Sequence, residues 1–131
     1  MTTSLPITRR GFVAGCGVAL LGWRRPAPAH PTPRPGITAA NVLPDSELVD
    51  APEALPAFAA ARRIPQVLDG IRCNCGCAAL PGFYSLLSCY EASGMARICV
   101  ICQGQARLAD RLERAGKSLD EIRAATDARF G

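Results

Sequence analysis

The stretch CVICQGQARLADRLERAGKSLDEIRAATDARF, residues 99–130, decides the fold class. Apolar side chains recur near helical spacing in its first half, at Ile101, Leu108, Leu112 and Ala115. Gly116 follows them and is a typical residue just beyond a helix C-terminus. Ser118 and Glu121 then have the spacing of a capping box, which begins a second helix. The stretch therefore predicts two consecutive helices.

The preceding part of the chain adds shorter helices. Residues 52–70, PEALPAFAAARRIPQVLDG, are typical of a helix that breaks near Pro65. Another short helix is expected within residues 82–93, whereas residues 73–81 have the pattern of a loop. The sequence contains no alternating strand pattern of useful length. We therefore predict an all-α fold: a small cysteine-rich domain of three or four helices around a cysteine-rich loop, spanning 53–131.

The N-terminus has the pattern of an export signal. Thr8-Arg9-Arg10-Gly11-Phe12-Val13 resembles the twin-arginine signal pattern. The apolar run from Gly11 to Trp23 is about 13 residues long, and a membrane span needs roughly 20. Ala27-Pro28-Ala29 fits the small-x-small site of a signal peptidase. Residues 1–29 are thus predicted to be a twin-arginine-type signal peptide, with His30 as the first mature residue.

A second interpretation of the N-terminus stays open. Val13-Ala14-Gly15-Cys16 resembles a lipoprotein cleavage box, in which Cys16 would carry the lipid. It is disfavoured because most of the apolar stretch follows Cys16. We expect a periplasmic or extracellular protein, anchored to a membrane only if Cys16 is lipidated.

Residues 30–52 are expected to form a disordered, Pro-rich linker. They contain five prolines, Pro31, Pro33, Pro35, Pro44 and Pro52, and few large apolar side chains. A folded part as small as 53–131 rarely has an adequate core without a disulfide or a metal.

The charge of the chain after the predicted signal is balanced. Four of the 15 basic residues lie in the first 25 positions, which leaves 11 basic residues against 11 acidic ones. A neutral domain has no electrostatic reason to bind nucleic acid or anionic lipid.

Six of the seven cysteines are concentrated in one part of this domain: Cys73, Cys75, Cys77, Cys89, Cys99 and Cys102. Cys99-x-x-Cys102 at the first turn of a helix places two sulfurs on one face, near unpaired N–H groups that lower thiol pKa values. This geometry suits a zinc or Cu(I) site and a redox disulfide equally well.

The backbone conformation of residues 73–77 decides whether the sulfurs of Cys73, Cys75 and Cys77 can meet. In an extended strand, alternate side chains point to opposite faces, so Cys75 would point away from the other two. A turn at Gly76 would let all three sulfurs converge, because glycine adopts conformations closed to other residues. A disulfide within Cys-x-Cys would be strained.

Other ligands and catalytic groups are scarce. The only histidine is His30, so a metal site here is expected to be largely thiolate, which selects soft ions such as Cu(I) or zinc. The usual general base is missing from the predicted domain, which argues against hydrolytic or phosphoryl-transfer catalysis and leaves an enzymatic role open. Asp69 and Glu91 are expected to be surface charges.

Residues 55–130 resemble a family of bacterial exported proteins and lipoproteins of uncharacterised function, named for a Pro-Cys-Tyr-Cys-Gly-Cys (PCYCGC) motif. The resemblance is carried by Cys73-x-Cys75-Gly76-Cys77, by Cys89 with an aromatic residue after it, and by Cys99-x-x-Cys102. Arg72 and Asn74 stand where the motif has Pro and Tyr. Family members often have histidines between the cysteine blocks, and this chain has none.

Residues 99–131 are also similar to the cytochrome c maturation protein H domain, a periplasmic three-helix thiol reductant. The similarity lies in the Cys-x-x-Cys-Gln segment and in the Gly-Lys-Ser…Glu-Ile segment that follows the helix. It implies a redox pair, Cys99 and Cys102, with Gln103 beside it. Ile98 separates Arg97 from Cys99 here, whereas the relative joins Arg directly to Cys.

Three functions remain open. The favoured hypothesis is an exported soft-metal-binding protein that handles copper or zinc, with all six of these cysteines as metal ligands. The second is a periplasmic thiol–disulfide oxidoreductase acting through Cys99 and Cys102, and the third is a disulfide-stapled binding module. The expected partners are a metal ion and a periplasmic redox or metal-delivery protein, with no nucleic acid.

Overall fold

The computed structural model describes residues 28–131 except residue 93, and this part is helical without a strand. Its main helices are α2 (Leu55–Arg63), α3 (Pro65–Asp69), α4 (Val100–Arg114) and α5 (Leu119–Phe130). Short 3-10 helices precede α2 or lie between α3 and α4: η1 (Ala39–Asn41), η2 (Asp45–Glu47), η3 (Pro52–Ala54), η4 (Cys77–Ala79), η5 (Leu86–Tyr90) and η6 (Met95–Arg97). The helices pack around a buried cysteine cluster, which confirms the predicted all-α class.

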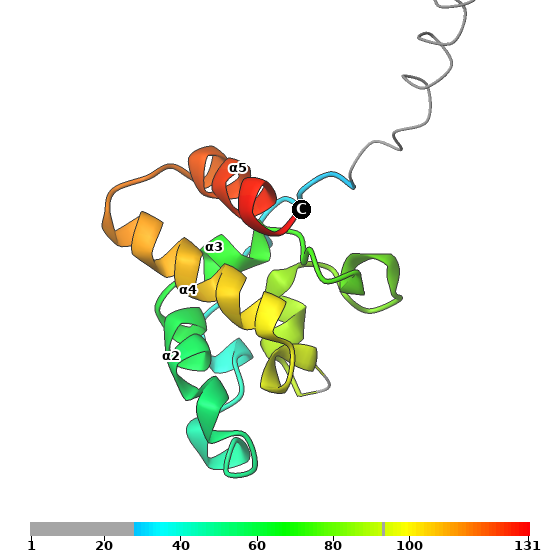
Figure 1. Cartoon of the computed structure of the whole chain (residues 1–131), viewed down its shortest axis with the longest axis vertical. Coiled ribbons are helices and arrows are strands. Elements are labelled where there is room, and N and C mark those ends of the chain that lie inside the picture. Colours follow the sequence, from blue (N-terminus) through cyan, green and yellow to red (C-terminus); the bar gives the residue numbers. More distant parts are fainter. Residues whose placement is uncertain (1–27, 93) are drawn as a thin grey trace, which may run out of the picture.

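Helix α4 lies at the centre of the arrangement. Figure 1 shows α5 along one side of α4 and α2 along the other, with α3 behind. None of the described helices is both long enough and apolar enough to cross a membrane. The predicted signal peptide and Cys16 lie outside the described residues.

The signals at the helix ends act as the sequence predicted. Pro65 occupies the first turn of α3, where its missing N–H costs nothing. Gly116, between α4 and α5, has a φ of +79°, which favours glycine. The Ser118 hydroxyl accepts from Glu121 N at 3.2 Å, and the Glu121 carboxylate accepts from Ser118 N at 2.7 Å. The predicted capping box is therefore confirmed.

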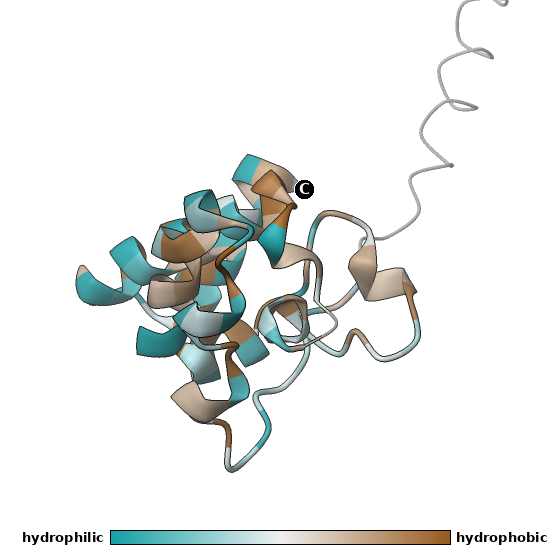
Figure 2. Ribbon diagram, turned by 90° about the horizontal axis from the view of Figure 1, so that it is seen from below, coloured by the Kyte–Doolittle hydropathy of each residue, from teal (hydrophilic) through white to brown (hydrophobic). Residues whose placement is uncertain are grey.

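The core joins α2, α3, η5 and α4. Its largest fully buried side chains include Phe58, Leu68, Leu86 and Tyr90. The rings of Phe58 and Tyr90 meet edge to face with 4.8 Å between centroids. Figure 2 shows the helices striped in teal and brown, as expected where one face of a helix is buried and the other is solvated.

Residues 30–52 differ from the predicted disordered linker. Ile37, Val42, Leu48 and Ala51 are all buried in the core. Their positions follow neither a helical nor a strand period, so no periodic pattern reveals them. Proline also lowers the entropy lost when such an extended segment is ordered. The folded unit therefore begins before residue 53.

An ion pair between an exposed arginine and a buried carboxylate attaches the same segment to α3. The Asp69 carboxylate, whose side chain is fully buried, accepts hydrogen bonds from Arg34 N at 2.7 Å and from Arg34 Nη2 at 2.6 Å. Ser85 Oγ donates to it at 2.8 Å. The expectation that Asp69 is a surface charge is therefore wrong, because its partners are remote in sequence.

Candidate metal centre

The structure brings together, beside the N-terminus of α4, all six cysteines that the sequence analysis predicts as metal ligands. Three come from the loop after α3, one from η5, and two from the start of α4: Cys73, Cys75, Cys77, Cys89, Cys99 and Cys102. All six are free thiols. They meet because η5 and the loop after α3 both pack against α4 or the turn before it.

Four of these thiols form a buried set, which we call the inner set: Cys73, Cys77, Cys89 and Cys102. Their exposed fractions are between 0% and 3%, and their Sγ atoms all lie within 4.8 Å of one another. Zn–S bonds of about 2.3 Å place tetrahedral sulfurs about 3.8 Å apart. The Cys73 and Cys102 sulfurs are 3.4 Å apart. The inner set is therefore positioned as possible ligands for a metal ion.

A second set of three thiols overlaps with the first. The Sγ atoms of Cys75, Cys99 and Cys102 also lie within 4.8 Å of one another, and we call them the outer set. Cys75 and Cys99 are half-buried, unlike the members of the inner set. The Cys75 sulfur also lies 3.2 Å from that of Cys73 and 2.9 Å from that of Cys77. The two sets are thus contiguous.

The loop turns at Gly76 as the convergence of three sulfurs requires. Gly76 has a φ of +96°, in the left-handed region, and it directly precedes η4. A Cβ there would meet no atom within 4 Å, so the backbone conformation alone favours glycine. The turn keeps Cys75 in contact with Cys73 and Cys77.

Two glutamines of α4 hold the backbone around the thiols. Gln105 is fully buried; its Nε2 donates to Arg72 O at 3.2 Å and its Oε1 accepts from Asn74 N at 3.0 Å. These bonds flank Cys73 on both sides. Gln103 Nε2 donates to Ala96 O at 2.8 Å, in the turn before α4. Sequence reasoning missed Gln105, although its position on the buried stripe of α4 was a usable signal.

Arg72 and Asn74, on either side of Cys73, attach the loop to α5. Arg72 Nη2 lies 2.9 Å from Asp127 Oδ1, and Asn74 Nδ2 donates to the same oxygen at 3.1 Å. His30 Nε2 lies 3.0 Å from Asp127 Oδ2, and its Nδ1 accepts from Arg72 N at 3.2 Å. Both His30 nitrogens are therefore engaged away from the thiols, and the ring orients the loop.

The turn between η5 and α4 brings its backbone unusually close to Cys89. A Cβ on Gly94 would lie 2.2 Å from the carbonyl carbon and oxygen of Cys89, so only glycine fits. Met95 follows, and the Cys77 thiol donates to its Sδ at 3.5 Å. This thioether, which sequence reasoning missed, places a further soft donor beside the inner set.

The thiols share their protons unequally. Hydrogen bonds from Cys102 and Cys89 hold the pKa of the Cys73 thiol far below its usual range. The hydrogen bond to Cys73 raises the pKa of Cys102, and burial raises the pKa of Cys75. Metal binding to these thiols would therefore release protons.

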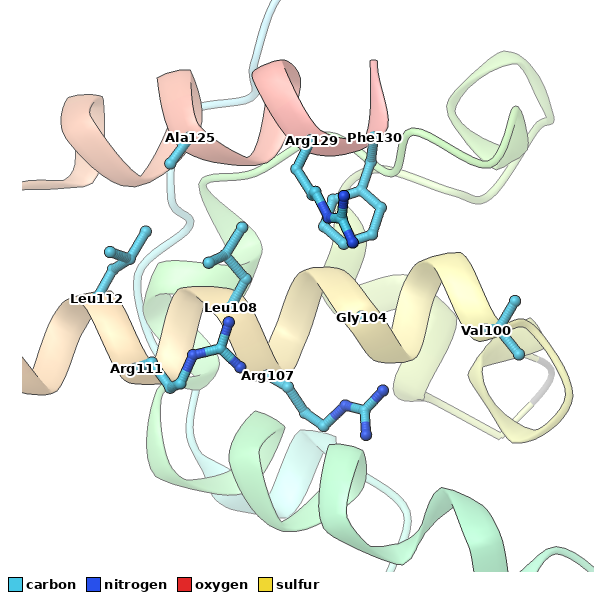
Figure 3. A pocket seen from close by; sticks show the side chains of 9 residues that line it. All are labelled: Val100, Gly104, Arg107, Leu108, Arg111, Leu112, Ala125, Arg129 and Phe130. Carbon is cyan, nitrogen blue, oxygen red and sulfur yellow. The ribbon is translucent and has the colours of Figure 1, made fainter.

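A separate groove of about 640 Å³ lies between α4 and α5. Figure 3 shows Leu108 and Leu112 of α4 facing α5, with Phe130 directed toward Gly104. The other lining residues are Val100, Arg107, Arg111, Ala125 and Arg129. The lining contains no cysteine, histidine or carboxylate, so this groove offers none of the usual protein ligands for a metal ion.

No protein-family model, curated protein or solved structure matches this chain. The site consists of a buried group of four cysteines placed as possible metal ligands, with Cys75 and Cys99 beside it.

Proposed function

We propose that this protein binds a soft metal ion through clustered cysteine thiolates and serves in copper or zinc handling outside the cytoplasm. The observation that carries the proposal is the inner set: four buried Sγ atoms, all within 4.8 Å of one another. A structural disulfide needs only two sulfurs, whereas a tetrahedral thiolate site needs four.

The donor chemistry suits both Cu(I) and zinc. Thiolate ligands bind both ions, a tetrahedral set of four suits zinc, and a thioether beside the thiolates suits Cu(I). Met95 Sδ contacts Cys77 within the site, and both His30 nitrogens are engaged elsewhere. The site therefore combines thiolates with a thioether.

The predicted twin-arginine signal supports a location outside the cytoplasm. This pathway generally carries proteins that are already folded, so the ion could be acquired before export. The destination is an oxidising compartment, where free thiols do not persist. An ion bound to the inner set would protect its four thiols from oxidation.

The test is to recover the protein anaerobically after export, measure its metal content by mass spectrometry and count its reactive thiols. We expect copper or zinc near stoichiometry, and at least tenfold weaker Cu(I) affinity in Cys89→Ser, measured by competition with a chromophoric chelator. Ile122→Val, a buried change on α5, is the control and should bind normally. A protein without metal and with almost no free thiols would overturn the proposal.

Thiol–disulfide exchange is a second candidate, favoured by one observation. Cys99 is the N-cap of α4, and its Sγ accepts from Cys102 N at 3.4 Å, so the two cysteines of the pair lie together at the helix N-terminus. In this function Cys99 and Cys102 would form a disulfide while passing two electrons and two protons to a partner disulfide. A metal-free exported protein that carries only this disulfide, with a potential in the range of known reductants, would favour it.

A further inference from the structure

We infer that the thiol set holds two metal ions, bridged by the shared thiolate of Cys102, and that the ion in the outer set is the exchangeable one. The inference rests on the proposed function of soft-metal binding. It extends that function by assigning a second site and a route for ion transfer.

Cys102 is the one cysteine common to both sets of sulfurs. The inner set offers four ligands, including Cys102, and the outer set offers three, again including Cys102. A thiolate sulfur has enough lone pairs to bind two metal ions at once. Six cysteines thus supply a four-coordinate site and a three-coordinate site that meet at one sulfur.

A single ion would leave the outer thiols without a role. A tetrahedral ion takes four sulfurs, which leaves Cys75 and Cys99 unused. Yet the Cys75 sulfur lies 3.5 Å from that of Cys102 and 2.9 Å from that of Cys77, within the same cluster. The contacts of Cys75 therefore fit a ligand of a neighbouring ion that shares the cluster.

Charge compensation favours a second cation. Thiolates gathered in a buried site repel one another and are costly without a counter-charge. Arg72, the arginine of the cysteine loop, is already paired with Asp127. When the outer thiols lose their protons, a second ion compensates their negative charge, which Arg72 does not.

The two sites differ in access to solvent. All inner ligands are at most 3% exposed, whereas Cys75 and Cys99 are half-buried. The neighbours of Cys99 in the chain, Ile98 and Val100, are 77% and 75% exposed, so this short segment lies at the surface. An incoming ligand can reach the outer ion without unfolding the domain.

Transfer from the outer site is a ligand exchange. Incoming thiolates form bonds to the three-coordinate outer ion one at a time, as its bonds from Cys99, Cys75 and Cys102 break in turn. Cys99 and Cys75 then take up protons from solvent, and Cys102 stays bound to the inner ion. The metal keeps its oxidation state throughout, so no electron acceptor is needed. The inner ion stays in place because its ligands are closed to solvent.

The test uses Cd(II), a soft ion that accepts the same thiolate geometry as zinc and can be followed by 113Cd NMR. The reduced, metal-free exported protein should bind two Cd(II) by native mass spectrometry, and the two NMR signals should show coupling through the shared sulfur. Removal by excess chelator should be biphasic, with one fast and one slow equivalent.

Substitutions separate the two sites. Cys99→Ser and Cys75→Ser should each bind one Cd(II) and lose the fast phase, whereas the adjacent exposed change Val100→Ala should retain both ions. These half-buried positions avoid the folding problem that Cys102→Ser could cause. Circular dichroism checks the fold of each variant.

Several results would overturn the inference. Binding of one ion, unaffected by Cys99→Ser and Cys75→Ser, would remove the outer site and leave the proposed function intact. Two uncoupled NMR signals would remove the bridge. Failure to bind any Cd(II), Cu(I) or zinc would instead overturn the proposed function itself.

Discussion

Replacing Gln105 with alanine should destabilise the metal-free protein and weaken its metal binding. This buried amide bonds to Arg72 O and Asn74 N, on either side of Cys73. Alanine would leave both backbone groups without these partners, and each buried orphan costs about 1–3 kcal/mol. Asn74 is only half-buried, so water can recover part of its loss. With the small cavity added, the expected cost is about 2–4 kcal/mol.

Urea unfolding of the reduced protein under anaerobic conditions, followed by circular dichroism, measures this cost. The matched control is Gln66→Ala, since Gln66 is exposed and makes one bond, to Ile37 O at 3.3 Å. That change should cost less than about 1 kcal/mol. Gln105→Met restores much of the volume without the amide bonds and should recover less than half of the loss. Equal costs for Gln105→Ala and Gln66→Ala would refute the reasoning.

Three further outcomes follow. Burial raises the pKa of Asp69, but hydrogen bonds from Arg34 and Ser85 lower it by more. The Arg34–Asp69 pair therefore stabilises the fold above about pH 4, and this contribution is lost as the pH falls through the lower pKa that Asp69 has in the folded state. In Asp69→Asn, the free energy of unfolding measured in urea should therefore decrease less steeply as the pH falls below about 4. Gly94→Ala should cost at least about 2 kcal/mol in the same assay, because its Cβ would overlap the Cys89 carbonyl, and an unchanged midpoint would contradict this. The affinity for Cd(II), measured by competition with a chelator, should increase between about pH 6 and 8. The reason is that the pKa of Cys75 is raised, so this thiol releases a proton when it binds the ion. An affinity that does not change with pH would show that the thiols are already ionised.

Local sequence signals were sufficient for the breaks between the main helices. Pro65 separates α2 from α3, Gly116 turns the chain after α4, and the capping box of Ser118 and Glu121 begins α5. Each of these signals depends on residues within one helical turn. Over that distance the backbone geometry that a proline, a glycine or a capping residue favours determines where a helix begins or ends.

The segment before α2 could not be predicted in the same way. Its buried apolar residues follow no helical or strand period, and their burial depends on the other parts of the chain that they pack against. Asp69 is a similar case, since its partners Arg34 and Ser85 lie 35 and 16 residues away. Sequence patterns describe the residue and its neighbours in the chain, but not what packs against it.

The sequence by itself determined the chemistry available: six thiols in the domain, a single histidine, and a glycine able to turn the loop at residue 76. Only the tertiary structure decided how the sulfurs group. Cys73 and Cys102 are 29 residues apart in the chain, yet their sulfurs lie 3.4 Å from each other. Cys102 also joins both sets of sulfurs. The reason is physical: ligand proximity depends on how η5, α4 and the loop after α3 pack, and spacing along the chain does not specify packing.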